Sequence, residues 1–509
     1  MKRRKFIKSM GALGAAFSAP SFFTNNYFIK SASAAPLIGN VEFVLPARLP
    51  QVINVFLYGG PSELAGNLTN IVDINNNSQN PYTSVESDIL MNMDINDATA
   101  PGQITPHGFW KDAGGLIMEG MLASGDLSVY RTINRRKENS RAHRLSILSS
   151  QKGNLDIEIS GGVGTTLASV LYANKSLLDG SALLGGRQLE ELLLPFVSFE
   201  GESSAFASDA RAGSIQLPLQ LKGISMDQNF ANPYTRDRGI GDEAVIDALV
   251  AKVSGGSISR YQKVNEGFIN REKLVSQISG LGAAIDTANA ATYLPNVGAG
   301  DVDGNATTGV LEYPNNSFSR RVQAAVTLAM QNPDSLYITI GGELGGWDDH
   351  DNSIDKYKTR MTDLMTTLRV AAKHIRLGSR VGAAAGIPTD NIIINVHGDF
   401  GRNVNLNGSM GWDHGNNQNL YTIGGAGVRA AGALGKVVGS TERFGDAGQN
   451  RQYTRPTSSS YEAEPMSIAS SVYSYFGVRN PQELTKDSIK NTAGDPAIDE
   501  TVAGESVLF

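Results

Sequence analysis

The sequence contains no cysteine among its 509 residues. This absence excludes disulfide bonds and a lipid anchor attached through cysteine, so a hydrophobic core has to stabilise the folded chain. Hydrophobic residues make up 41% of the sequence, which is too large a share for a mainly disordered protein and enough for one large domain. Histidine is scarce as well, with six residues, so a grouping of histidines points to a specific site.

The N-terminus has the pattern of a twin-arginine export signal. Arg3 and Arg4 precede a mildly apolar stretch over residues 10–29, and Ala32-Ser33-Ala34 offers small residues for a signal peptidase. We therefore predict a signal peptide over residues 1–34, recognised by the twin-arginine translocase, and a periplasmic or secreted mature protein. The alternative is an N-terminal membrane anchor, but glycine, proline and asparagine make the stretch too weakly apolar to span comfortably, and no later stretch approaches transmembrane length.

Positive charge is in short supply in the predicted mature chain. Removal of residues 1–34 takes away six basic residues and no acidic ones, which leaves 38 basic and 50 acidic residues and a net charge of −12. Such a surface repels the phosphates of nucleic acids and of anionic membranes. No stripe of Lys and Arg is interleaved with aromatic residues, so we expect neither nucleic acid nor a stable membrane anchor among its partners.

Short β-branched and aromatic runs alternate with amphipathic helical patterns. The clearest helical pattern, over residues 357–375, joins two of these runs. This succession predicts an α/β fold in which helices cover both faces of a largely parallel sheet, with the functional loops at the carboxyl ends of its strands. The runs that predict buried strands are residues 52–58, 127–131, 196–199, 336–340 and 391–396.

Residues 201–316 interrupt this alternation. A Ser-, Ala-, Asp- and Gln-rich region precedes two helical stretches at residues 244–253 and 261–291, and a Gly-, Asn- and Asp-rich loop follows at residues 298–308. No internal repeat and no persistent Pro/Ser-rich linker marks a domain boundary. We therefore predict a single domain over residues 35–509 that carries an insertion or cap.

Three segments concentrate Asp, His and Gly. Residues 345–350 (GGWDDH) follow one predicted strand, residues 397–402 (HGDFGR) follow the next, and residues 411–415 (GWDHG) come shortly after. Divalent metals bind neutral imidazole nitrogens and carboxylate oxygens, and glycines let the backbone bend so that side chains from several strand ends converge. The sequence therefore predicts a shared divalent-metal site, for zinc, manganese or calcium.

Each segment alone also has a structural interpretation. Asp413 could orient the ring of His414 within a turn, and Asp348-Asp349 could cap a helix that begins near Ser353. Arg402 could contact a bound anion or a structural carboxylate. The occurrence of three such segments at successive strand ends favours a shared site.

Taken in order, these segments resemble the bacterial exported family called domain of unknown function 1501. The resemblance covers most of the mature chain and is weakest over residues 201–316. That family is grouped with the alkaline phosphatase and sulfatase superfamily, which implies an α/β sandwich with Asp and His ligands at strand ends around one or two divalent metals. The matching stretches are Arg3-Arg4, residues 56–60 (FLYGG), 346–350 (GWDDH), 399–402 (DFGR), 411–415 (GWDHG) and the amphipathic run 465–478.

The resemblance also implies a ligand set. Asp348 and His350 would form one ligand pair, Asp399 would be the acid of the next strand, and His414 would complete the site with Asp413 nearby. A metal held there would polarise a phosphoryl or sulfuryl oxygen and lower the pKa of a hydroxyl or water nucleophile.

Two positions depart from the family pattern. The family has Gly-Gly-x-Asp where this chain has Pro61-Ser62-Glu63 after its glycines, so Glu63 would act as a ligand only if the loop shifts by one residue. The family often has Ser-His where this chain has Ala142-His143, with Ser140 nearby. Ser62, Ser140 and His143 are therefore the candidate catalytic residues, and a serine nucleophile is not secured.

The sequence as a whole predicts an exported metal-dependent hydrolase of phosphate or sulfate esters, acting on a small anionic ester. The departures from the family pattern at Glu63 and at Ala142-His143 support an alternative in which the protein is not an enzyme. In that alternative the protein keeps the fold without turnover and serves as a periplasmic or surface binding or assembly protein.

Overall fold

The computed structural model describes most of the chain outside its termini and its middle. The predicted signal peptide, Ser140 and both helices expected within residues 201–316 lie outside the described residues. The described residues are 41–67, 104–136, 141–200, 203–209, 293–341, 344, 346–404, 407–444 and 453–485.

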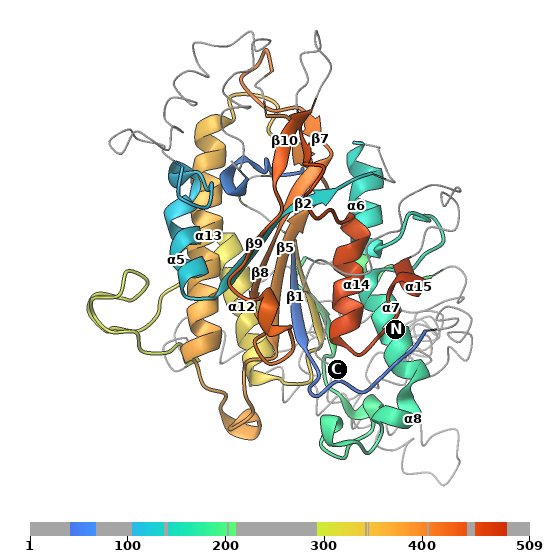
Figure 1. Ribbon diagram of the computed structural model, residues 1–509. Coiled ribbons are helices and arrows are strands. Elements are labelled where there is room, and N and C mark those ends of the chain that lie inside the picture. The colour runs from blue at the N-terminus through green and yellow to red at the C-terminus, as the bar shows by residue number, and fades with distance from the viewer. Residues whose placement is uncertain are drawn as a thin grey trace, which may run out of the picture.

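A seven-stranded sheet forms the centre of the molecule, with the strand order β3-β4-β1-β5-β8-β2-β9 (Figure 1). β8 runs antiparallel to both of its neighbours, and the other pairings are parallel. The five predicted strands and the largely parallel α/β sheet are thus confirmed. The strands are β1 (Gln51–Leu57), β2 (Leu127–Asn134), β3 (Phe196–Ser198), β4 (Tyr337–Gly341), β5 (Ile392–Gly398), β8 (Asn417–Gly424) and β9 (Val437–Val438).

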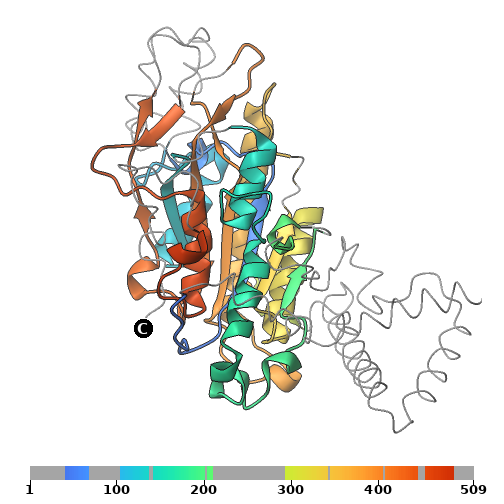
Figure 2. The same ribbon diagram turned by 90° about the vertical axis from the view of Figure 1, so that its right-hand side faces the viewer.

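Helices cover both faces of this sheet because its strands are apolar on both sides. Ile53 and Val55 of β1 pack into one core with helices α5 (Gly115–Ala123), α12 (Ser317–Gln331) and α13 (Ile354–Leu377). Val52, which directly precedes Ile53 and therefore faces the opposite side of the sheet, packs into a second core with α7 (Val163–Ala173) and α14 (Pro465–Tyr475). Figure 2 looks onto the second face, where these helices lie in front of the sheet. α13 is the helix expected at residues 357–375, extended at both ends.

Smaller elements surround the two layers. The further helices are α6 (His143–Lys152), α8 (Lys175–Leu178) and α15 (Gln482–Thr485). Two hairpins pair β6 (Gly401–Arg402) with β7 (His414–Gly415) and β10 (Thr441–Phe444) with β11 (Tyr453–Pro456). Single 3₁₀ turns are η3 (Leu64–Gly66), η4 (Lys111–Ala113), η5 (Ala182–Leu184), η6 (Leu189–Glu191), η7 (Ser204–Phe206), η9 (Gly382–Ala384) and η10 (Ala431–Ala433).

The parallel strands bring chemically active loops to one edge. β1, β2, β4 and β5 all end at the edge that points to the top of Figure 1, where α6 begins. The β6–β7 hairpin then places Arg402 directly opposite His414. The second and third Asp/His/Gly segments are therefore joined by backbone pairing, and the first lies beside them after β4.

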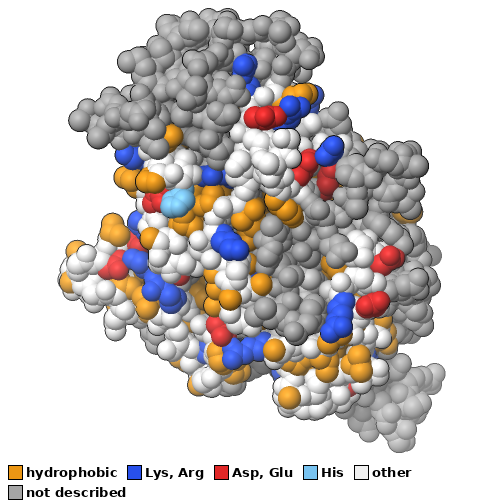
Figure 3. All heavy atoms as spheres, viewed as in Figure 1, with side chains coloured by type: hydrophobic (Ala, Val, Ile, Leu, Met, Phe, Trp, Pro, Cys, Tyr) orange, Lys and Arg blue, Asp and Glu red, His pale blue; other side chains and the backbone are white. Residues whose placement is uncertain are grey.

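The described surface mixes polar and apolar side chains. On the face shown in Figure 3, the described Lys and Arg residues are interspersed with Asp and Glu and with hydrophobic side chains. Across the ranges that the structure describes, we find no helix with the length and apolarity needed to cross a membrane.

Candidate metal centre

Four side chains meet at the carboxyl edge of the sheet. His143 is the first residue of α6, Asp348 and His350 lie in the loop after β4, and His414 begins β7. Each offers one ligand atom, and these atoms all lie within 4.8 Å of one another. We call these four residues the His/Asp cluster.

The spacing within the cluster matches that of ligands around a small cation. Oδ1 of Asp348 lies 3.2 Å from His143 Nε2, 3.0 Å from His350 Nε2 and 3.6 Å from His414 Nε2. The Nε2 atoms of His350 and His414 are 3.0 Å apart. Ligand atoms bonded at about 2.0 Å to a tetrahedral zinc ion are about 3.3 Å apart, so little movement separates the cluster from that geometry.

Each imidazole is anchored through its other nitrogen. A carbonyl or a carboxylate oxygen can only accept a hydrogen bond, so the anchored Nδ1 carries the hydrogen and the Nε2 of a neutral ring presents a lone pair. All three lone pairs are thereby directed at Asp348. The Nδ1 contacts are His143 to Asp399 Oδ2 at 2.7 Å, His350 to Asp413 Oδ1 at 3.2 Å, and His414 to the Arg141 carbonyl at 2.7 Å.

A cation fits this set of donors. Lone pairs and a carboxylate that face one another repel unless a proton or a metal lies between them. Nε2 of His143 is buried and makes no hydrogen bond within the described part of the chain. Three imidazole nitrogens and one carboxylate oxygen are a common ligand set for zinc, and less suited to calcium, which prefers oxygen.

Glycine permits the close approach of the loops that carry the cluster. Gly59 adopts φ of +107°, and a Cβ there would lie 2.5 Å from the backbone nitrogen of Asp348. A Cβ on Gly411 would lie 2.1 Å from the carbonyl carbon of His350. Any larger residue at either position would push the loop after β4 away from its neighbours.

Arg402 lies beside the cluster with its side chain fully buried. Its Nη2 donates to Asp348 Oδ1 at 2.7 Å, and its Nη1 lies 3.3 Å from His350 Nε2. The remaining donors go to backbone carbonyls, so an anion would have to displace one of these bonds to reach the guanidinium. The carbonyls are those of Gly59, Gly60, Trp347 and Trp412.

These surroundings set the charges of the cluster. Partial burial raises the pKa of Asp348, but the hydrogen bond and charge of Arg402 outweigh it and leave that pKa below its ordinary value. Burial, assisted by the charge of Arg402, lowers the pKa of His414. The hydrogen bond to Asp399 raises the pKa of His143. At neutral pH the site therefore offers an ionised Asp348 and a neutral His414.

The other two predicted acids lie behind the rings. Asp399 is fully buried, and its two oxygens accept from His143 and from the backbone nitrogen of Gly59, the latter at 3.1 Å. Asp413 contacts Nδ1 of His350. The structure thus brings Asp348, His350 and His414 together and uses Asp399 and Asp413 to orient the ligands.

Glu63 and Ser62 are buried and form hydrogen bonds outside the cluster. The carboxylate of Glu63 accepts from the backbone nitrogen of Arg402 at 3.0 Å and from the hydroxyl of Thr454 at 2.7 Å. The hydroxyl of Ser62 accepts a hydrogen bond from the backbone nitrogen of Leu64 at 3.3 Å. Ser140, the third candidate from the sequence, lies outside the described residues.

Two contributors were missed or placed in another role by sequence reasoning. His143 was expected to act in catalysis, and the structure places it among the potential ligands. Arg135 was not considered: it is buried and bridges the carbonyl of Asp399, at 2.6 Å, to the carbonyl of Ser146 in α6, at 2.8 Å. Both follow β2, so a scan of the residues after every predicted strand would have found them.

Asp399→Asn should weaken metal binding by about 10- to 100-fold, the range typical of partners that orient a metal-bound histidine. The amide would keep an oxygen for Gly59 but present its NH₂ group to His143, which would move the ring hydrogen to Nε2 and block that ligand. The measurement is a competition titration with a zinc-binding dye. Unchanged affinity in a folded variant would show that Asp399 does not orient His143.

Glu63→Gln should change how stability depends on pH. Burial raises the pKa of Glu63 from its ordinary 4.5 to about 7, so the folded protein binds this proton more tightly than the unfolded chain does. The resulting stabilisation is complete below pH 4.5 and is lost as the pH rises through 7, by at most about 3 kcal/mol. The glutamine cannot ionise. The free energy of unfolding of the variant should therefore be close to that of the parent near pH 5 and higher than that of the parent at pH 8. Urea titrations at both pH values measure this, and parallel pH profiles would contradict it.

No protein-family model matches this sequence, and no curated protein matches it either.

Proposed function

We propose that this protein is exported by the twin-arginine route and that its His/Asp cluster binds one divalent cation, with zinc as the best fit, to hydrolyse phosphate or sulfate esters. We extend the proposal to the fold, as an alkaline phosphatase-like domain related to the exported family named above. A mostly parallel sheet with its Asp and His side chains at the carboxyl edge supports this extension.

The convergence of three Nε2 atoms on Asp348 carries the proposal. The four residues come from three separate segments of the chain, and each ring is held by its own acceptor. Three imidazole nitrogens and a carboxylate oxygen that face one another in this way are stabilised when a cation or a proton lies between them. A divalent metal, when bound, would polarise an ester oxygen and lower the pKa of the attacking nucleophile.

The residues around the cluster would hold the metal ligands in their orientations. His143, His350 and His414 are held by hydrogen bonds, and Arg402 keeps Asp348 ionised. The hydroxyl of Ser62 accepts a hydrogen bond from the backbone nitrogen of Leu64. We propose water as the nucleophile that attacks the ester.

The contact between Arg402 and Asp348 favours a second candidate. A buried guanidinium already neutralises the one carboxylate of the cluster, so the site could persist without a metal. The protein would then be a periplasmic or surface binding or assembly protein that keeps the fold without turnover.

Metal content and ester hydrolysis of the purified chain separate these two candidates. The hydrolase should hold close to one zinc or manganese per chain and release nitrophenol from 4-nitrophenyl phosphate or sulfate, and a chelator should abolish the activity. Restoration of activity by the metal is the matched control. No bound metal and no thermal shift with zinc, manganese or calcium would overturn the hydrolase and leave the binding role.

A further inference from the structure

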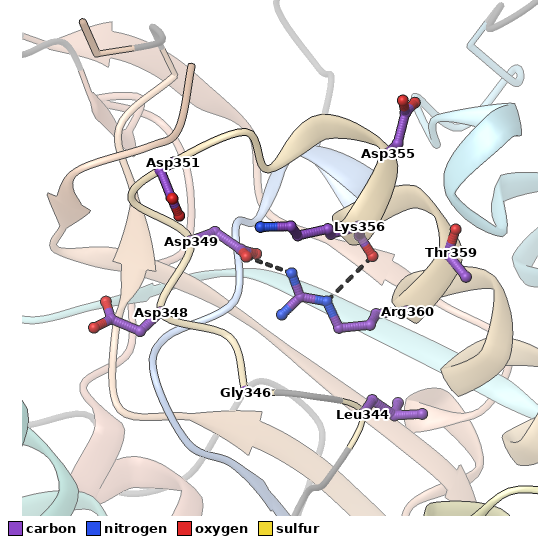
Figure 4. A pocket seen from close by; sticks show the side chains of 9 residues that line it. All are labelled: Leu344, Gly346, Asp348, Asp349, Asp351, Asp355, Lys356, Thr359 and Arg360. Carbon is purple, nitrogen blue, oxygen red and sulfur yellow. Dashed lines mark hydrogen bonds and ion pairs between the residues drawn. The ribbon is translucent and has the colours of Figure 1, made fainter. Parts of the chain in front are cut away.

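The loop after β4, which carries Asp348 and His350, borders open space on one side. A hollow of about 680 Å³ lies between this loop and the first two turns of α13 (Figure 4). The side chain of Arg360 reaches from α13 to the loop and pairs with Asp349. Because close-packed side chains do not fill the hollow, the position of the loop depends on contacts from its opposite side as well.

The connection between β6 and β7 supplies contacts on that opposite side. The backbone nitrogens of Asn352 and Ser353 donate to the carbonyls of Ser409 and Met410, at 2.9 Å and 3.0 Å. These two bonds hold the end of the loop that leads into α13. Neither of them involves His350, which has to be held by other contacts.

Asn407, in the same connection, holds His350 in two ways. Its Nδ2 donates to the backbone carbonyl of His350 at 3.0 Å and to Oδ1 of Asp413 at 3.2 Å. The same Oδ1 of Asp413 lies 3.2 Å from Nδ1 of the His350 ring. One amide group therefore fixes both the backbone of this ligand and the acceptor that orients its ring.

The partners of Asn407 also determine which way its amide points. Its Oδ1 accepts from the backbone nitrogens of Ser409 and Gly411, at 2.9 Å and 3.1 Å. A carbonyl and a carboxylate oxygen can only accept, so they require the NH₂ group on the other side. An aspartate at this position would keep the accepting oxygen, lose both donors and direct a second negative charge at Asp413.

We infer that Asn407 is a positioning residue of the metal site, which directs the Nε2 lone pair of His350 by holding the His350 carbonyl and Asp413. The inference rests on the proposed metal site and adds a residue that supplies no ligand atom itself. Partners that orient a metal-bound histidine typically contribute about 10- to 100-fold to metal affinity. Asn407 acts one step further out, through Asp413 and the backbone, so the lower end of that range applies.

The zinc affinity of Asn407→Ala tests this role. A competition titration with a zinc-binding dye should show a loss of about tenfold relative to the parent. Asn305→Ala is the matched control, because the side chain of Asn305 likewise accepts from two backbone nitrogens, those of Thr307 and Thr308, but lies outside the β6–β7 connection. Equal affinity in the parent and both variants would overturn the inference and leave the proposed function standing.

Asn407→Asp separates positioning of His350 from support of the turn. The aspartate keeps an acceptor for Ser409 and Gly411, and its negative charge by itself would attract a cation. Zinc affinity below that of the parent, in spite of this added charge, supports the positioning role. Equal or higher affinity contradicts it.

A measurement without metal decides the inference if the parent binds no zinc and the proposed function falls. Nitrogen NMR of isotope-labelled histidines in the chelator-treated protein, above neutral pH, shows which ring nitrogen carries the hydrogen. His350 should carry it on Nδ1, beside Asp413, in the parent, and should shift toward the Nε2 form in Asn407→Ala. The His350→Ala spectrum identifies the signal. The same ring form in the parent and in Asn407→Ala would refute the positioning role.

Discussion

His350→Ala is expected to reduce zinc affinity by at least about 100-fold, because it removes one of four ligands and leaves a gap that water fills poorly. His350 Nε2 lies 3.0 Å from both Asp348 Oδ1 and His414 Nε2, so its removal takes away a ligand atom close to two others. The protein should retain its fold, since His350 lies in a loop and 43% of its side chain is exposed. Zinc content after dialysis and competition titration measure the loss.

His107→Ala is the matched control for this prediction. His107 is exposed and pairs with Glu119 at 2.7 Å, away from the His/Asp cluster. Its removal deletes the same imidazole group and should leave zinc binding unchanged. Equal zinc content in the parent and both variants would show that any bound metal lies elsewhere, and the proposed function would fall.

Arg402→Met should lower the free energy of unfolding by about 4 kcal/mol or more, the scale for breaking a buried ion pair. The methionine would leave the carbonyls around the guanidinium without donors and would strip Asp348 of its counter-charge. The loops after β1, β4 and β5 are all held by this one side chain. Urea unfolding monitored by circular dichroism measures the change.

Arg144→Met provides the comparison for that experiment. Arg144 is 74% exposed in its side chain and pairs with Glu158 on the surface, so its replacement should cost less than about 0.5 kcal/mol. Arg402→Lys should fall between the two, because it keeps the charge but loses the planar fork. A loss for Arg402→Met as small as that for Arg144→Met would contradict the role of Arg402 as the support of these loops.

Much of the sheet could be predicted from local patterns. Apolar β-branched runs such as that of β5 read as buried strands, and α13 shows regular spacing of Met361, Leu364 and Leu368. β8 was not predicted, because its first half, Asn417–Asn419, is polar. These amides are buried by contacts with distant residues such as Glu63 and Arg131, which no local pattern contains.

The candidate site was predicted in part. The grouping of Asp, His and Gly after β4 and β5 located Asp348, His350 and His414, because parallel strands end at a common edge. The sequence did not show which of these acids would be metal ligands and which would orient the ligands through hydrogen bonds. Asp399 and Asp348 have similar sequence surroundings, yet one is fully buried behind a ring and the other has half of its side chain exposed at the cluster.

The sequence by itself determined five of the sheet's strands, helix α13, the largely parallel arrangement and the set of loops at the carboxyl edge, because these follow from periodicity and chain order. Tertiary structure alone decided that His143 joins the His/Asp cluster, that Arg402 donates a hydrogen bond to Asp348, and that a hollow lies beside them. Those outcomes depend on the directions of side chains from segments far apart in the chain. Such directions are set by packing and by buried hydrogen bonds, which the spacing of residues along one chain does not encode.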